Sequence, residues 1–207
     1  MDTNLNSCLM LAVNLDCPIS LKALFDEADL KDTGVELDSH ITLLYAQGKE
    51  IDRKEILSDI ETILGDEDYD DFIARIAKAK VIPVFDVFEL GCFENDSDYL
   101  ILKLKKDSQI YSWLSQINRA LRIRYDVSSD FADYTPHLSL AELQPGTVGK
   151  YLESEEIKNV LNDSVVSLDD IMISYGLSNE PEDRKQYFLT AFHSVDRYFR
   201  LKNLKAE

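Results

Sequence analysis

Two short segments of this 207-residue chain, about a hundred residues apart, share one pattern of histidine, hydroxyl and hydrophobic residues. The first reads HITL from His40, and the second reads HLSL from His137. Both lie in hydrophobic runs bounded by polar or turn residues, which predicts β-strands. Alternate side chains of a strand share a face. We therefore expect His40 and Thr42 to lie on one face of their strand, and His137 and Ser139 on one face of theirs.

An imidazole beside a hydroxyl, present twice, suits acid–base chemistry on a phosphate. Opening a phosphodiester requires one proton to be removed and another to be donated, and histidine titrates near pH ~6.5. The hydroxyls of Thr42 and Ser139 would donate hydrogen bonds to the non-bridging phosphate oxygens. An alternative stays open, in which both histidines are half-buried strand residues that only bond to their neighbours. The third histidine, His193, lacks the pattern because Val195 follows it at the second position.

The remaining hydrophobic periodicity predicts an α+β fold. Strands are expected at residues 8–15, 37–45, 72–79, 81–90, 99–104, 165–175 and 186–195, in addition to the second motif. Helices are expected at residues 21–28, 51–64, 108–124 and 154–161. The acidic run at 66–71 and the segment at 126–133 are predicted loops, and the tail at 196–207 a frayed end or short helix. No linker rich in Gly, Pro or Ser divides the chain, which favours a single domain.

With these two motifs the chain resembles the two-histidine (2H) phosphoesterase superfamily, whose signature is a pair of His-x-(Thr/Ser)-hydrophobe strands. The run TPHLSL from Thr135 is especially similar to the second motif of bacterial members. The resemblance implies one bilobal domain over residues 1–207. Its two pseudo-symmetric lobes would each be an antiparallel sheet with covering helices, around a central cleft that receives one motif from each lobe. It also implies four catalytic residues, His40, Thr42, His137 and Ser139, and a reaction without metal or other cofactor.

Three further residues are candidates for substrate binding. Asn14 is polar on an otherwise apolar strand face and would reach the cleft, although a role at the strand end is equally open. Tyr187 and Phe188 begin the closing strand, and one of them could stack on a nucleobase. Plain core packing is the alternative for both aromatic residues.

The formal charge of −17 constrains the substrate. Proteins that bind long nucleic acids carry a basic surface, because phosphate contacts supply most of the affinity. Here 22 basic residues face 39 acidic ones. Basic residues do gather in two groups, which we interpret as solvated strand and helix faces: Lys103, Lys105 and Lys106, then Arg119, Arg122 and Arg124. A small nucleotide therefore fits this charge better than a polymer does.

The cysteine content and hydropathy predict a soluble, cytoplasmic protein, and we expect a monomer. The chain has no apolar run of membrane-spanning length and no basic-then-apolar leader. Cys8, Cys17 and Cys92 are odd in number and not spaced as a metal or redox motif, so we expect reduced thiols, with Cys8 a small buried hydrophobe.

Four possible functions follow from these observations. The leading hypothesis is a metal-independent phosphodiesterase that acts on a 2′,3′-cyclic phosphate or on a cyclic or 2′,5′-linked oligonucleotide messenger. Phage members of similar families destroy such messengers. The alternatives are a nucleotide-binding module without activity, an RNA end-processing enzyme, and a metal-dependent hydrolase that uses the acidic run at 66–71. The sequence leaves open which histidine is the base.

Overall fold

The computed structural model describes residues 5–128, 133–176 and 184–192. Its strands form two sheets in which every pairing is antiparallel. The first sheet has the order β3-β1-β8-β4, with β9 also paired to β8, and the second has the order β2-β7-β6-β5. The strands are β1 Asn6–Asp16, β2 Leu30–Val35, β3 His40–Ala46, β4 Ile82–Pro83, β5 Phe88–Glu94, β6 Asp98–Leu104, β7 His137–Leu143, β8 Val165–Gly176 and β9 Lys185–Phe188.

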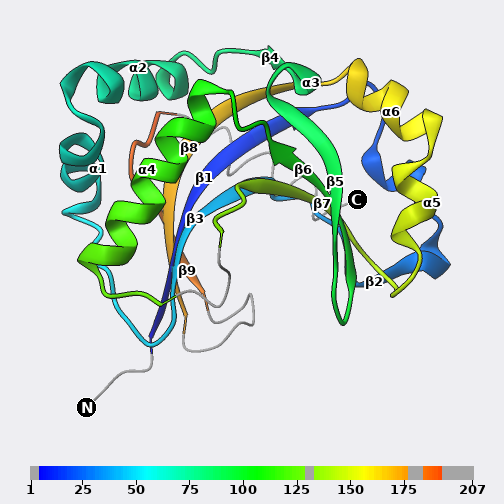
Figure 1. The fold of residues 1–207 in the computed structure, drawn as a ribbon, viewed down its shortest axis with the longest axis horizontal. Coiled ribbons are helices and arrows are strands. Elements are labelled where there is room, and N and C mark those ends of the chain that lie inside the picture. Colours follow the sequence, from blue (N-terminus) through cyan, green and yellow to red (C-terminus); the bar gives the residue numbers. More distant parts are fainter. Residues whose placement is uncertain (1–4, 129–132, 177–183, 193–207) are drawn as a thin grey trace.

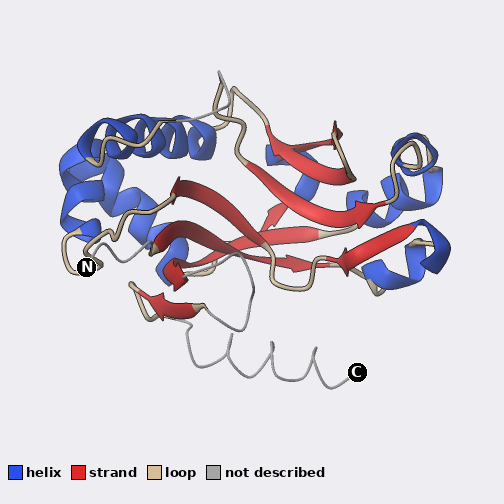
Figure 2. Cartoon of the chain, turned by 90° about the horizontal axis from the view of Figure 1, so that it is seen from below, coloured by secondary structure: helices blue, strands red, loops and turns tan. Residues whose placement is uncertain are grey.

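Helices gather at the two ends of the sheets (Figures 1 and 2). At one end lie α1, α2 and α4, and at the other lie α5 and α6. The helices are α1 Ile56–Leu64, α2 Asp66–Ala77, α3 Val84–Val87, α4 Gln109–Arg124, α5 Val148–Leu152 and α6 Glu155–Asn162, with 3₁₀ turns at Leu21–Leu24 and Glu27–Asp29. The predicted α+β class with two antiparallel sheets and covering helices is confirmed.

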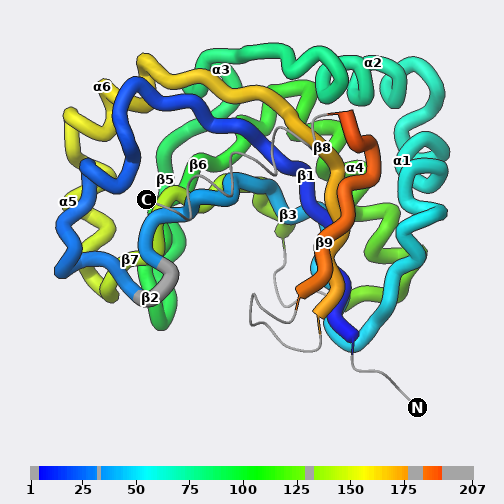
Figure 3. Tube along the Cα trace, turned by 180° about the vertical axis from the view of Figure 1, so that it is seen from behind, coloured from blue at the N-terminus to red at the C-terminus, as the bar shows by residue number. Residues whose placement is uncertain are grey.

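The first sheet is assembled from both ends of the sequence. Strands β1 and β3 come from the first fifty residues, whereas β8 and β9 come from the last part of the described chain. Figure 3 shows β1 lying between β3 and β8. The two motif strands fall in different sheets, β3 in the first and β7 in the second, as the two-lobed arrangement requires.

One hydrophobic cluster connects the two sheets. It contains Leu9 and Leu11 of β1 together with Leu138 and Leu140 of β7. Trp113 of α4 belongs to it with 1% of its surface exposed. Helix α4 also has the predicted start, because the hydroxyl of Ser108 accepts a hydrogen bond from the backbone N–H of Tyr111.

The predictions for residues 66–79 were wrong. A loop and then a strand were expected, but the segment is the single helix α2. Its acidic first turn follows Gly65, and negative side chains at a helix N-terminus are stabilised by the helix dipole. Phe72 and Ile76, four residues apart, are buried on one helical face.

Smaller corrections concern element boundaries. The helix expected at 21–28 is two 3₁₀ turns, the one expected at 51–64 begins at Ile56, and the strand expected at 81–90 is divided among β4, α3 and β5. Strand β2 and helix α5 were not predicted. The expected strand at 186–195 is β9 only as far as Phe188, residues 189–192 are not strand, and residues 193–207 lie outside the described part of the chain. No helix in the part of the chain that the structure describes is long and apolar enough to cross a membrane.

Candidate functional site

The motif side chains alternate with buried residues along both strands. In β3, Ile41 and Leu43 are fully buried, while His40 and Thr42 are half-buried. Strand β7 repeats the same order of burial over its first five residues, with His137 and Ser139 half-buried. In each sheet, we call the face that carries the histidine and the hydroxyl residue the motif face. Each histidine therefore shares a face with its hydroxyl residue, as the alternation predicted.

Each motif ends in a β-bulge at the same position. The pairing of β3 with β1 skips Leu43, the residue after Thr42. The pairing of β7 with β6 skips Leu140, the residue after Ser139. A bulge bends its strand and changes the direction of the side chains beside it. The two motif strands are therefore equivalent in local geometry as well as in sequence.

Both imidazoles are held by the same backbone contact. The Nδ1 atom of His40 lies 2.8 Å from the carbonyl oxygen of Asp38, and the Nδ1 atom of His137 lies 2.8 Å from that of Thr135. A carbonyl oxygen only accepts, so Nδ1 carries the hydrogen in each ring. Nε2 is then the nitrogen that takes or gives a proton.

A tyrosine hydroxyl links the two motifs. The Tyr134 hydroxyl, three residues before His137, donates a 2.8 Å hydrogen bond to the carbonyl oxygen of Thr42. Burial raises the pKa of Tyr134, which keeps the phenol protonated as a donor. From α4, the Asn118 side-chain amide donates to the Leu43 carbonyl oxygen at 2.7 Å. Sequence reasoning missed both residues, because neither has a regular spacing from the motif that it supports.

The surroundings of the two histidines differ. Burial is the main cause that lowers the pKa of His137, and the charges of His40 and Lys103 lower it further, against the opposing effect of the Thr135 hydrogen bond. Since burial disfavours the charged form, the neutral imidazole is favoured at His137. The contribution of His40 also means that the two imidazoles lie within electrostatic range of each other.

An aromatic ring and a lysine accompany His137 on the motif face. The ring of Phe93 meets the imidazole edge-on, with centroids 4.8 Å apart. Lys103 is the cross-strand partner of His137, and its Nζ lies 5.6 Å from the centroid of Phe93. We had interpreted Lys103 as part of a solvated strand face, but the strand pairing places this half-buried residue beside the second motif.

The candidate substrate-binding residues are divided between the two faces of the first sheet. Asn14 continues the motif face two residues after Ala12, the partner of His40. Phe188 packs against Met10 and Met172 on the same face. Tyr187 lies on the opposite face, where it packs against the main core and makes an edge-on contact with Tyr175 at 5.8 Å. The structure thus brings Asn14 and Phe188, but not Tyr187, to the motif face.

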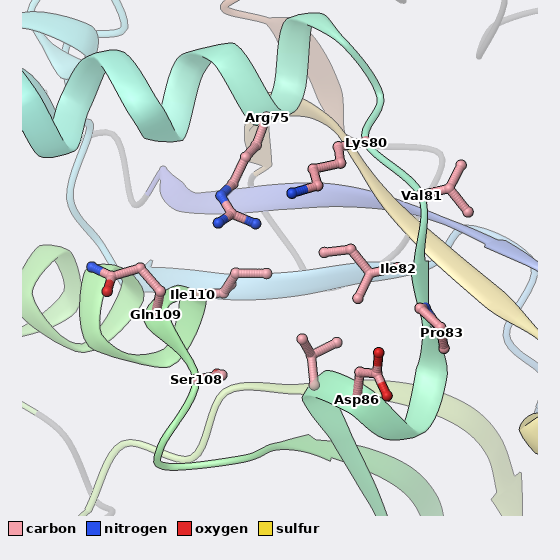
Figure 4. A pocket seen from close by; sticks show the side chains of 10 residues that line it. Arg75, Lys80, Val81, Ile82, Pro83, Asp86, Ser108, Gln109 and Ile110 are labelled. Atoms are coloured by element: carbon pink, nitrogen blue, oxygen red, sulfur yellow. The ribbon is translucent and has the colours of Figure 1, made fainter.

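A cavity of about 400 Å³ lies away from the motifs, between α2, the β4–α3 segment and the start of α4 (Figure 4). Arg75 and Lys80 extend into it from above, and Ser108 and Gln109 line it from α4. None of the predicted site residues lines this cavity. Among the described residues, no group of three or more His, Cys, Asp and Glu side chains could hold a metal ion.

Comparisons with known proteins found structural likeness only. No family model matches the chain, and no curated protein matches it. The solved structure of Kluyveromyces marxianus Usb1 is similar, with a TM-score of 0.44, 12% identity, and coverage of 89% of this chain and 98% of that one. The same protein with uridine monophosphate gives a TM-score of 0.41 at 11% identity, covering 90% and 99%. A structure described as a phosphoesterase gives 0.42 at 14% identity, covering 88% and 95%.

These likenesses are too distant to carry an argument about the activity of this chain. The described residues themselves have the architecture that the resemblance to two-histidine phosphoesterases implies: two antiparallel sheets, each with one His-x-(Thr/Ser) strand.

Proposed function

We propose that the chain is a phosphodiesterase that hydrolyses a small nucleotide phosphodiester by acid–base catalysis with two histidines. The observation that carries this proposal is the equivalence of the two motif strands. In each, the histidine Nδ1 is bonded to the carbonyl two residues earlier, and a bulge follows the hydroxyl residue. A histidine with only a structural role would not require the same contact and bulge to be repeated at a second histidine.

In the proposed reaction His137 is the general base and His40 the general acid. The lowered pKa of His137 favours the neutral imidazole, which takes a proton from the attacking water at Nε2. The bond from the water oxygen to phosphorus forms as the bond to the leaving oxygen breaks. The protonated ring of His40 gives its Nε2 proton to that oxygen. Thr42 and Ser139 donate hydrogen bonds to the non-bridging oxygens as negative charge increases there.

The proposed substrate is small: a 2′,3′-cyclic phosphate, or a cyclic or 2′,5′-linked oligonucleotide. The net charge of −17 supports this choice, because a long anionic polymer would be repelled over most of the surface. We further propose that residues 1–207 act as one bilobal, monomeric domain in the cytoplasm. The core cluster shared by both sheets and the three free cysteines support this part of the proposal.

The decisive experiment screens nucleoside 2′,3′-cyclic phosphates and cyclic di- and trinucleotides in the presence of EDTA. We expect turnover of at least one of them, and we expect His40→Ala and His137→Ala each to reduce it by about 10²-fold or more. His193→Ala, at the histidine without the motif, is the matched control and should retain activity. Turnover that EDTA abolishes, or that persists in either folded motif variant, would contradict the proposal.

A further inference from the structure

Lys103 lies flat across a glycine of the neighbouring strand. A Cβ atom added to Gly91 of β5 would be 2.8 Å from Cε of Lys103 and 3.1 Å from both Cδ and Nζ. Gly91 is not among the glycines with positive φ, so its backbone does not require glycine. A glycine inside a strand weakens that strand and often marks a place where another group approaches closely. Here the approaching group is the Lys103 side chain.

This side chain leans from β6 over β5, whose Phe93 ring contacts His137. Lys103 pairs across the ladder with Glu89 on one side and with His137 on the other. Opposite charges at such positions usually attract each other, yet among the described residues Lys103 has no ion-pair partner within 4.0 Å. Its Nζ instead lies over Gly91, in the direction of Phe93, whose ring contacts His137. The ammonium group therefore belongs to the surroundings of His137.

At the first motif the equivalent strand position holds an uncharged residue. The residue paired with His40, in the position that Lys103 has relative to His137, is Ala12, which is fully buried. The two motifs are thus alike in their histidines and hydroxyls but differ in the residue paired with the histidine. In a protein of net charge −17, the ammonium group of Lys103 provides a local attraction for an anion near the second motif.

We propose that the ammonium group of Lys103 binds a phosphate oxygen of the substrate beside His137, and that Gly91 provides the space this side chain needs. The inference rests on the proposed function, since it takes the substrate to be a nucleotide phosphate. A lysine acts as a compact positive charge toward phosphate, and a charge-assisted hydrogen bond is about twice as strong as a neutral one. The same contact would set the direction in which the phosphate enters the site, with its anionic oxygens toward the second sheet.

Binding measurements test this without requiring turnover. We would titrate adenosine 3′-monophosphate and adenosine into the wild-type protein and into Lys103→Met and Lys103→Arg, using calorimetry. Lys103→Met should weaken binding of the monophosphate about 10- to 100-fold and leave adenosine nearly unchanged. Lys103→Arg should retain most of the affinity. Lys106→Met, which removes the same charge from an exposed position three residues away, is the matched control.

A second pair of variants moves the lysine without removing it. Gly91→Ala should displace the Lys103 side chain. Binding of the monophosphate should then weaken, as it does in Lys103→Met, although Lys103 is still present. Gly149→Ala adds a methyl group where no atom lies within 4 Å, so it should have no effect on binding. Folding of each variant is checked by circular dichroism.

The outcomes separate this inference from the proposed function. If Lys103→Met and Lys106→Met weaken binding of the monophosphate equally, or if neither weakens it, Lys103 makes no specific contact. The inference is then overturned, whether or not the wild type hydrolyses its substrate. If only Lys103→Met and Gly91→Ala weaken binding of the monophosphate, the inference stands. This holds even if the screen finds no hydrolysis and the proposed function fails.

Discussion

At the scale of single residues, the two motif histidines make the same kind of backbone contact but have different neighbours. The Nδ1 atoms of His40 and His137 each bond at 2.8 Å to the backbone carbonyl oxygen two residues earlier. The difference between the two rings comes from neighbours such as Phe93 and Lys103 on the adjoining strands. The sequence could predict the four motif residues, because they recur at a fixed spacing. It could not predict these neighbours, because strand pairing is a long-range property that no local spacing records.

Titration of His137 should show this difference directly. Its pKa should lie below the ordinary value of about 6.5. Lys103→Met removes one of the positive charges that lower it, so the pKa should rise, and the acidic limb of the activity profile should move to higher pH. The measurement is a ¹H–¹⁵N imidazole NMR titration, with Lys106→Met as the control for net charge. A wild-type pKa at or above the ordinary value would remove the basis for calling His137 the base.

The hydroxyls should matter less than the imidazoles. In the proposed reaction, Thr42→Ala and Ser139→Ala would each remove a hydrogen bond to the phosphate, so we expect kcat/KM to fall roughly 10- to 100-fold. Steady-state kinetics on the substrate found in the screen provide the measurement. Thr62→Ala is a suitable comparison, because that exposed hydroxyl donates to the carbonyl oxygen of Ser58 within α1. A silent Thr42→Ala would reduce Thr42 to a residue that only favours strand formation.

At the scale of elements, strong local patterns were predictable and weaker ones were not. The motif strands and α4 follow clear periods of two and 3.6 residues. Helix α2 was missed because its first turn is acidic and only two of its residues, Phe72 and Ile76, are buried. The bulges that follow Thr42 and Ser139 depend on the register with a partner strand, which the hydrophobic alternation alone does not give.

One buried carboxylate connects β6 to the start of α5. The Oδ2 atom of Asp98 accepts hydrogen bonds from the backbone N–H groups of Gly146, Thr147 and Val148, at 2.8, 3.1 and 3.2 Å. Asp98→Ala would leave these donors without their partner, so we expect the free energy of unfolding to fall by about 2–4 kcal/mol. Urea denaturation followed by circular dichroism measures the change. Asp107→Ala, at an exposed turn position, should have little effect, and equal losses in both variants would contradict the assigned role.

At the scale of the whole molecule, the net negative charge should favour small nucleotide substrates over long nucleic acids. A chain of net charge −17 repels a polyanion over most of its surface, whereas a dinucleotide bound as we propose would touch only the motif faces. We expect a higher kcat/KM for a cyclic dinucleotide or adenosine 2′,3′-cyclic phosphate than for a 30-mer RNA with a cyclic phosphate end. The dependence on salt should be weak. A preference for the 30-mer that disappears as salt increases would show that the folded surface concentrates positive charge after all.

The position of β1 between β3 and β8 has a consequence for how the protein folds during synthesis. The pairing with β3 is local, but the pairing of Leu11 with Ile171 joins residues about 160 positions apart. Contacts of such separation form slowly, because the chain must close a long loop first. A nascent chain that ends before β8 therefore holds both histidine motifs without the sheet that supports the first of them. We therefore expect the ability to bind substrate to appear only after β8 has been synthesised.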